Sequence, residues 1–194
     1  MAEAVSTLTK KYFASLSNRD LPRQRCVILF SGVPGSGKSH IARSIEQERG
    51  AIRISNDDIR DLIVAENPTV TIAERERIKF GVATALLSLL ETSPNGLIVF
   101  DVSCDRPGGY EFYDDWARPQ GYRVVLLRMD VPRATLERRI YQRGDTGYRK
   151  ATQSLAGLDG WWKEWEAFGK RQRPDLIITP DTPIGLVLDV VDRV

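Results

Sequence analysis

The sequence predicts an α/β fold, in which a parallel five-stranded sheet is flanked by helices. Short apolar segments alternate along the chain with longer amphipathic ones, an order typical of strands joined by crossover helices. The strand-like segments are almost continuously apolar, as expected where both faces of a sheet are covered. A chain of 194 residues, 42% of them hydrophobic, can bury one such core. We therefore expect one main domain with a small appendage.

The appendage is predicted at the N-terminus, where residues 1–24 form a helix and a linker before the main domain, residues 25–194. Apolar side chains recur at helical intervals at Val5, Leu8, Tyr12 and Leu16. The polar stretch that follows contains Pro22, which indicates a linker.

Strands are predicted where short apolar runs stand between turn residues. They cover residues 25–30, 51–55, 97–100, 122–127 and 176–178. The third is the clearest, because it follows the turn Pro94-Asn95-Gly96.

Helices are predicted in the amphipathic segments between these strands. They cover residues 40–49, 57–65, 71–91, 110–118, 132–143, 160–168 and 183–193. Pro132 suits the first position of its helix, and Gly144 suits the end. The polar, glycine-containing residues 145–157 are predicted to form a loop.

Residues 32–39 read Gly-Val-Pro-Gly-Ser-Gly-Lys-Ser and fit the phosphate-binding pattern G-x-x-x-x-G-K-[ST] between a strand and a helix. The glycines let the backbone curl, so that successive N–H groups point at one anion. The lysine can reach the β- and γ-phosphates of ATP, and the serine hydroxyl can bind Mg²⁺. The candidate nucleotide-binding residues are Gly32, Val33, Pro34, Gly35, Ser36, Gly37, Lys38, Ser39 and His40.

Asp57 and Arg60 follow the second predicted strand. In parallel sheets, ligands bind beyond the carboxyl ends of the strands, so both residues fall near the phosphate site. They are one helical turn apart and can face one site. Asp57 is a candidate general base for an acceptor hydroxyl, and Arg60 a candidate anchor for an acceptor phosphate. The alternative is a plain helix start, with Asn or Asp as the cap.

Asp101 ends the third predicted strand and is a candidate for the Mg²⁺ and substrate side of the site, directly or through water. The alternative is an ordinary polar residue at a strand end. Asp105 and Arg106 lie nearby and are weaker candidates.

Arg139 and Arg143 are four residues apart on one helical face, just before the polar loop. They are predicted to act in catalysis with Lys38 and Asp57, as part of a lid at about 139–158. In such a lid, arginines close over the ATP phosphates and neutralise the charge that develops during transfer. A solvated basic helix end is the alternative.

Tryptophans follow the polar loop, and Trp161 and Trp165 are four residues apart, so both can pack on the core. A stacking platform for a nucleobase or an aromatic acceptor is the alternative.

The composition limits the class of protein. The formal net charge of +2 does not indicate nucleic-acid binding by the whole surface. Cys26 and Cys104 have no metal-binding spacing and are expected to be buried free thiols in a reducing compartment. No apolar run has the length of a membrane span, and no signal-peptide core opens the chain. We expect a cytoplasmic protein.

Three segments, GVPGSGKS, SNDDIR and DVPRATLERRIYQRG, together resemble the polynucleotide 5′-hydroxyl kinase branch of the P-loop phosphotransferases. The resemblance spans about residues 26–145 and implies a P-loop kinase sheet with a lid. It also implies roles for individual residues. Asp57 matches the general base, Arg60 the arginine on the acceptor's phosphate, and Arg143 the lid arginine. Arg139 matches a neighbouring lid position, and Asp101 matches the acid at the end of the third strand.

The main functional prediction is an ATP- and Mg²⁺-dependent kinase that phosphorylates the 5′-OH end of RNA or DNA. An alternative keeps the chemistry but takes a small-molecule hydroxyl, on a nucleoside, a sugar or an antibiotic. The low net charge and single domain favour this alternative. A third possibility is a nucleotide-dependent switch ATPase, although a guanine-reading Asn-Lys-x-Asp segment is absent.

Overall fold

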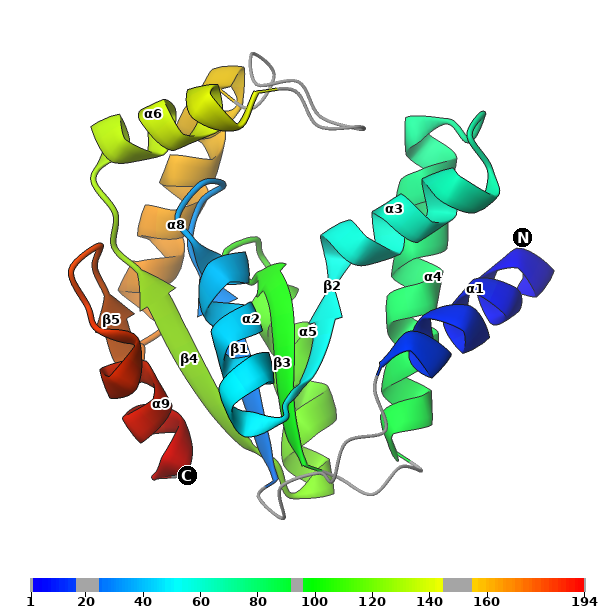
Figure 1. Cartoon of the computed structure of the whole chain (residues 1–194), viewed down its shortest axis with the longest axis horizontal. Helices are drawn as coiled ribbons and strands as arrows, with labels where there is room; N and C mark the ends of the chain where they lie inside the picture. Colours follow the sequence, from blue (N-terminus) through cyan, green and yellow to red (C-terminus); the bar gives the residue numbers. More distant parts are fainter. Residues whose placement is uncertain (1, 17–24, 92–95, 145–154, 194) are drawn as a thin grey trace.

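The computed structural model describes residues 2–16, 25–91, 96–144 and 155–193. At its centre is a five-stranded parallel sheet with the strand order β2-β3-β1-β4-β5 (Figure 1). The strands are β1 Cys26–Ser31, β2 Ile52–Ser55, β3 Leu97–Ser103, β4 Arg123–Met129 and β5 Leu176–Ile178. The predicted fold class is confirmed.

The helices match the predicted segments to within a few residues at their ends. The first four are α1 Ala2–Ser15, α2 Lys38–Arg49, α3 Asn56–Glu66 and α4 Ile72–Glu91. They are followed by α5 Gly109–Ala117, η1 Arg118–Gln120, α6 Arg133–Arg143, α8 Leu158–Arg171 and α9 Ile184–Asp192. Most of the predicted loop, residues 145–154, lies outside the described residues.

Apolar side chains on both faces of the sheet build the core. Successive strand side chains point to opposite faces, so β1 contributes to two clusters. Ile28 and Phe30 pack with α2 and α9, whereas Val27 and Leu29 pack with α1, α3, α4 and α5. Because β1 is buried throughout, the sheet holds the loop after it in a fixed position.

A third, smaller cluster joins the phosphate loop to α6 and α8. Val33 of the loop packs with Leu136 and Ile140 of α6 and with Trp165 of α8. The guanidinium of Arg128 lies over the Trp165 ring, 4.1 Å from its centroid. The predicted core packing of Trp165 is confirmed.

Two local predictions were wrong. Strand β3 does not end at residue 100 but continues to Ser103, so Asp101 lies within the strand. The reason is that β3 continues to pair with its neighbours, with Ser55 opposite Asp101 and Phe30 opposite Ser103. The cap of α3 is Ser55 rather than Asn or Asp, since its hydroxyl accepts a hydrogen bond from the Asp58 N–H.

Helix α1 packs against α3 and α4 and is tied to the end of β2. The Tyr12 hydroxyl accepts a hydrogen bond from the Ser55 N–H at 2.9 Å. Burial raises the pKa of Tyr12 to about 12, so the phenol stays neutral at physiological pH. This contact connects the N-terminal helix to the residue that caps α3.

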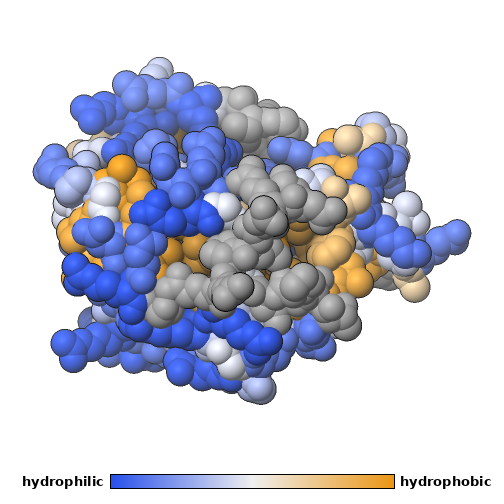
Figure 2. Space-filling model, turned by 60° about the horizontal axis from the view of Figure 1, so that its bottom comes forward, coloured by the Kyte–Doolittle hydropathy of each residue, from blue (hydrophilic) through white to orange (hydrophobic). Residues whose placement is uncertain are grey.

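The surface at the opposite end of the sheet from the phosphate loop is mainly hydrophilic where described residues form it, with hydrophobic atoms beside the grey region (Figure 2). Within the described ranges, no helix combines the length and apolar character needed to cross a bilayer.

Replacing Tyr12 with Phe should destabilise the protein, because the buried Ser55 N–H loses its acceptor. We expect the free energy of unfolding to fall by about 1–3 kcal/mol in urea denaturation. The control is Tyr141→Phe, since Tyr141 is 76% exposed and its replacement should change stability by less than about 0.5 kcal/mol. Equal effects of the two substitutions would contradict this role for Tyr12.

Candidate active site

The phosphate loop connects β1 to α2 through two left-handed glycines. Gly35 has a φ of 85° and Gly37 a φ of 101°, a region that disfavours residues with a Cβ. Gly32 is restricted by space instead, because a Cβ there would lie 2.8 Å from the Cβ of Met129. Helix α2 begins at Lys38 without a side-chain cap, so its first turn leaves N–H groups that can bind an anion. These features fit a bound phosphate chain.

Lys38 is folded back on its own loop. Its Nζ donates hydrogen bonds to the carbonyl oxygens of Gly32, at 2.8 Å, and Val33, at 3.2 Å. Burial lowers the pKa of Lys38, and the charges of Asp105 and Asp101 oppose that shift. The buried ammonium bonds directly to neutral carbonyl oxygens, and the nearby acids act on it through their charge. A bound anion would give it a negative partner in direct contact.

Ser39 and Asp101 form the candidate metal side. The Ser39 hydroxyl donates a 2.9 Å hydrogen bond to Oδ1 of Asp101, and both side chains offer the oxygen atoms that Mg²⁺ prefers. The described residues contain no cluster of three or more His, Cys, Asp or Glu side chains that could hold a metal alone. This donor set fits an ion held largely by nucleotide phosphates and water.

Arg53 is the other partner of Asp101. Its Nη1 donates to Oδ2 of Asp101 at 2.8 Å, its Nε donates to Glu46 of α2 at 3.1 Å, and its Nη2 donates to Asp58 of α3. Burial raises the pKa of Asp101, while the Ser39 hydrogen bond and the Arg53 charge counteract the rise. Both carboxylate oxygens of Asp101 are therefore engaged.

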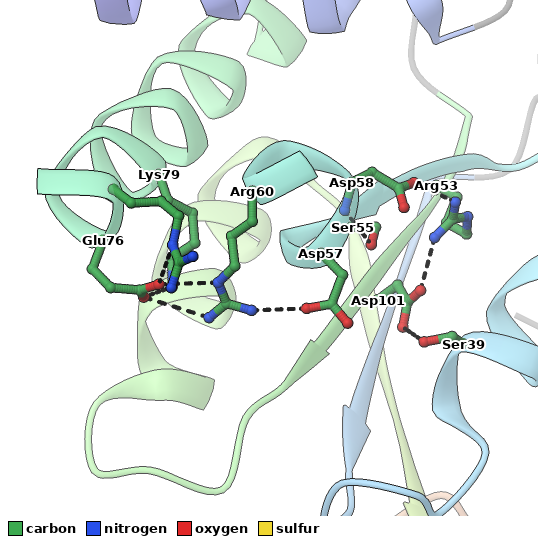
Figure 3. Close-up of polar contacts among 10 residues, drawn as sticks. Ser39, Arg53, Ser55, Asp57, Asp58, Arg60, Glu76, Lys79 and Asp101 are labelled. Atoms are coloured by element: carbon green, nitrogen blue, oxygen red, sulfur yellow. Dashed lines mark hydrogen bonds and ion pairs between the residues drawn. The ribbon is translucent and has the colours of Figure 1, made fainter. Parts of the chain in front are cut away.

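Asp57 and Arg60 lie together on α3, facing α4 (Figure 3). Nη1 of Arg60 donates to Oδ1 of Asp57 at 2.8 Å, and its Nε donates to Glu76 of α4 at 3.0 Å. Glu76 also accepts a hydrogen bond from Lys79. Oδ2 of Asp57 has no hydrogen-bond partner in the described part of the chain and is open to an acceptor hydroxyl.

These groups surround one cavity of about 650 Å³. It extends from the phosphate loop across Asp57 and Arg60 to the aromatic side chains Phe80 and Phe112, whose ring centroids are 5.7 Å apart. Arg139 and Arg143 of α6 line the opposite wall with Trp161. Donor-side and acceptor-side candidates thus share a single space.

Arg139 contacts the phosphate loop directly. Its Nη1 lies 3.4 Å from the carbonyl oxygen of Gly35 and 3.5 Å from that of Ser36. Arg143, one helical turn later, lines the cavity. Both arginines lie beside the place where phosphates would bind, and the rest of the predicted lid falls mainly outside the described residues.

Of the predicted site residues, all but Gly32 and Ser36 line this cavity. Gly32 lies behind the loop, where its N–H donates to the buried Asp105 carboxylate at 2.9 Å. The Ser36 hydroxyl is buried and has no hydrogen-bond partner within the described ranges. The catalytic and binding roles of the individual residues stay predictions.

Sequence reasoning missed several residues of this site: Arg53, Glu76, Lys79, Phe80 and Phe112. One signal was available for Arg53, which interrupts a short apolar strand with a charged residue. The others lie on helices α4 and α5, where nothing in the local sequence distinguishes a cavity-facing side chain from a solvated one.

Comparison with protein families gives a match over residues 27–164 to the AAA domain family AAA_33. The chain belongs to this family. The match covers the sheet from β1 to β4 and the cavity described above, and it extends into α8. No curated protein sequence matches this AAA domain chain.

Solved structures show that this family member has the P-loop kinase fold. Similar structures include the APS kinase CysC of Mycobacterium tuberculosis in complex with AMPPNP and APS, with a TM-score of 0.53 and 21% identity over 88% of this chain and 99% of that one. A gluconokinase from Sinorhizobium meliloti 1021 has a TM-score of 0.55 and 17% identity, over 87% and 90% of the two chains.

A third similar structure comes from the PezAT toxin–antitoxin system of Streptococcus pneumoniae, with a TM-score of 0.61 and 15% identity over 74% of this chain and 62% of that one. The family match and the kinase neighbours support the expectation of an ATP-dependent kinase. They do not show the polynucleotide kinase branch that the sequence motifs resemble.

Gly37→Ala should weaken ATP binding. Its left-handed backbone costs a residue with a Cβ about 1–2 kcal/mol, and relief of that strain would pull the loop out of its anion-binding shape. We expect affinity for ATP to fall by about tenfold or more in equilibrium titration. The control is Gly160→Ala in α8, where a Cβ meets no atom within 4 Å. That variant should bind ATP as the wild type does, and a Gly37→Ala variant that does the same would contradict the prediction.

The Glu76 contacts predict a pH dependence of stability. Burial alone would raise the pKa of Glu76, but hydrogen bonds from Arg60 and Lys79 outweigh it and lower the pKa from 4.5 to about 2. Since the folded-state pKa is depressed, this contribution is complete above pH 4.5 and is lost as the pH falls toward 2.

The measurement is the difference in urea midpoint between the wild type and Glu76→Gln, followed from pH 7 to pH 2. We expect the difference to shrink below about pH 4.5 and to stay small in size, because the side chain is 40% exposed and solvent screens its ion pairs. A difference that stays constant throughout would contradict the assignment.

Proposed function

We propose that this protein is an ATP- and Mg²⁺-dependent phosphotransferase that moves the γ-phosphate to a hydroxyl group of a small molecule. One observation carries the proposal: the phosphate loop and the open carboxylate oxygen of Asp57 face the same cavity. A triphosphate on the loop and a hydroxyl on Asp57 would then meet within one cavity, as phosphoryl transfer requires.

The donor side consists of residues that bind and orient the triphosphate. Lys38 donates to the phosphate oxygens, and the Ser39 hydroxyl and Asp101 hold the metal, with Asp101 acting through Ser39 or water. When bound, Mg²⁺ would neutralise part of the charge on the phosphates. Arg139 and Arg143 form the start of the proposed lid, 139–158, and stabilise the charge on the transferred phosphoryl group.

The acceptor side supplies the general base. Oδ2 of Asp57 accepts the hydrogen bond of the acceptor hydroxyl and then its proton, as the hydroxyl oxygen bonds to the γ-phosphorus. The bond from that phosphorus to the bridging oxygen breaks at the same stage, and ADP leaves. Arg60 fixes the orientation of the base through its hydrogen bond to Oδ1.

Several features favour a small-molecule acceptor. Behind Asp57 the cavity is lined by Phe80 and Phe112 and by balanced charges, with Arg60 and Lys79 bonded to Glu76. The low net charge of the whole chain provides little long-range attraction for a polyanion. The names of two similar structures, APS kinase and gluconokinase, also support a small-molecule kinase.

A transfer assay with radiolabelled ATP tests the proposal. The acceptors are nucleosides, sugars and hydroxylated antibiotics, with 5′-hydroxyl RNA and DNA oligonucleotides beside them. We expect label on a small molecule and little on the oligonucleotides. Faster labelling of an oligonucleotide end, weakening as salt rises, would support the nucleic-acid alternative instead. ATP hydrolysis that no acceptor changes would support a switch ATPase.

Asp57→Asn should abolish most transfer while leaving ATP binding intact. The amide keeps the shape of the side chain but cannot take a proton, so we expect kcat to fall by about 10²–10⁴-fold. The control is Asp61→Asn on the same helix, because Asp61 is exposed and does not line the cavity. An Asp57→Asn variant with the wild-type transfer rate would rule out this base.

A further inference from the structure

We propose that Arg53 is a positioning residue of the magnesium site. It holds the carboxylate of Asp101 in the one orientation in which this acid accepts the Ser39 hydroxyl, so that Asp101 in turn orients Ser39 toward the metal. The inference rests on the proposed function for the presence of Mg²⁺. It adds a residue on β2, away from the phosphate loop, to the determinants of metal binding.

The first argument is the division of the two Asp101 oxygens. Oδ1 accepts from Ser39 at 2.9 Å, and Oδ2 accepts from Nη1 of Arg53 at 2.8 Å (Figure 3). The Asp101 side chain is only 3% exposed, so water cannot readily replace either partner. A carboxylate held at both oxygens in this way is fixed in one orientation, because any rotation would break at least one of the two bonds.

The second argument is the state of the Ser39 hydroxyl. A hydroxyl has one proton and two lone pairs, and here the proton is committed to Asp101. The lone pairs are therefore available on the side of Ser39 that lines the cavity, where the metal would lie. Fixing Asp101 thus fixes which face of Ser39 is offered to the ion, a role typical of groups that orient metal ligands.

The third argument is that Arg53 is itself held rigidly. Its side chain is 11% exposed, and its fork contacts carboxylates on three elements: Glu46 on α2, Asp58 on α3 and Asp101 on β3. A planar guanidinium bonds several carboxylates in fixed directions, whereas a lysine ammonium is a compact charge on a flexible stem and fixes no such directions. Through Arg53, the position of Asp101 is therefore fixed relative to α2, which follows the phosphate loop, and relative to α3, which carries Asp57.

The test measures the affinity of the full chain for the ATP analogue AMPPNP by calorimetric titration, with Mg²⁺ and with EDTA. The quantity compared is the affinity measured with Mg²⁺ divided by the affinity measured with EDTA. Loss of a group that orients a metal ligand costs about 10- to 100-fold in metal affinity, and we expect Arg53→Met to lower the ratio by about tenfold or more. Binding in EDTA should stay within about threefold of the wild type, because the loop that holds the phosphates is unchanged.

A control variant separates positioning from the loss of any ion pair. Arg49→Met removes an arginine that bonds one carboxylate, that of Asp192, through two nitrogens on the surface, at 2.7 Å for each bond. We expect this variant to keep the wild-type ratio.

Arg53→Lys covers the case in which Arg53→Met does not fold, as judged by circular dichroism. It keeps the charge but loses the fork, and the ratio should again fall. A ratio unchanged in both variants, with only the melting temperature lowered, would show a purely structural role and overturn the proposal. A raised ratio would also overturn it, since Arg53 would then be shielding Asp101 from the metal.

The wild-type ratio separates this inference from the proposed function. A wild-type ratio of one would overturn the magnesium assignment and the Arg53 role together. A wild-type ratio well above one, with no phosphorylated acceptor found, would contradict phosphoryl transfer but not magnesium binding. The Arg53 variants would then still test the positioning role.

Discussion

The parallel pairing of β2 with β3 is the constraint on which the candidate site depends. Its register sets Ser55 opposite Asp101, at the edge of the sheet where the phosphate loop leaves β1. The same register brings Arg53 within reach of Asp101, and it starts α3 beside the loop, so that Asp57 lines the same cavity as the loop. A shift of one residue would turn Arg53 toward the opposite face and separate both acids from the loop.

Charge balance within the site follows from this geometry. Asp101 is buried, and a buried carboxylate remains charged only when cations and donors surround it. Arg53, Lys38 and the Ser39 hydroxyl fulfil that requirement from three sides. In the proposed function, a triphosphate with its metal would add both signs of charge at once, and Lys38 would exchange its carbonyl partners for phosphate while Asp101 kept its own. The structure is thus arranged before the nucleotide binds.

The fold was predictable because its signals are local. The apolar runs and the glycine pattern at residues 32–39 specify strands, helices and the donor loop without reference to distant residues. The acceptor side was only partly predictable. Asp57 and Arg60 belong to a short motif on one helix, but Glu76 reaches Arg60 from α4, 16 residues later. Arg53 likewise acquires its role only through contacts that the folded sheet creates.

These long-range contacts change the interpretation of Arg60. The sequence predicts an anchor for an acceptor phosphate, yet in the structure Arg60 already donates to Asp57 and, through two nitrogens, to Glu76. An anionic acceptor near Arg60 would be repelled by Glu76 and Asp57, the two carboxylates that already bond this guanidinium. A neutral hydroxyl compound would meet no such repulsion at the open oxygen of Asp57. The ion pairs around Arg60 therefore support the proposal of an uncharged acceptor group next to Asp57, in which Arg60 orients the proposed base.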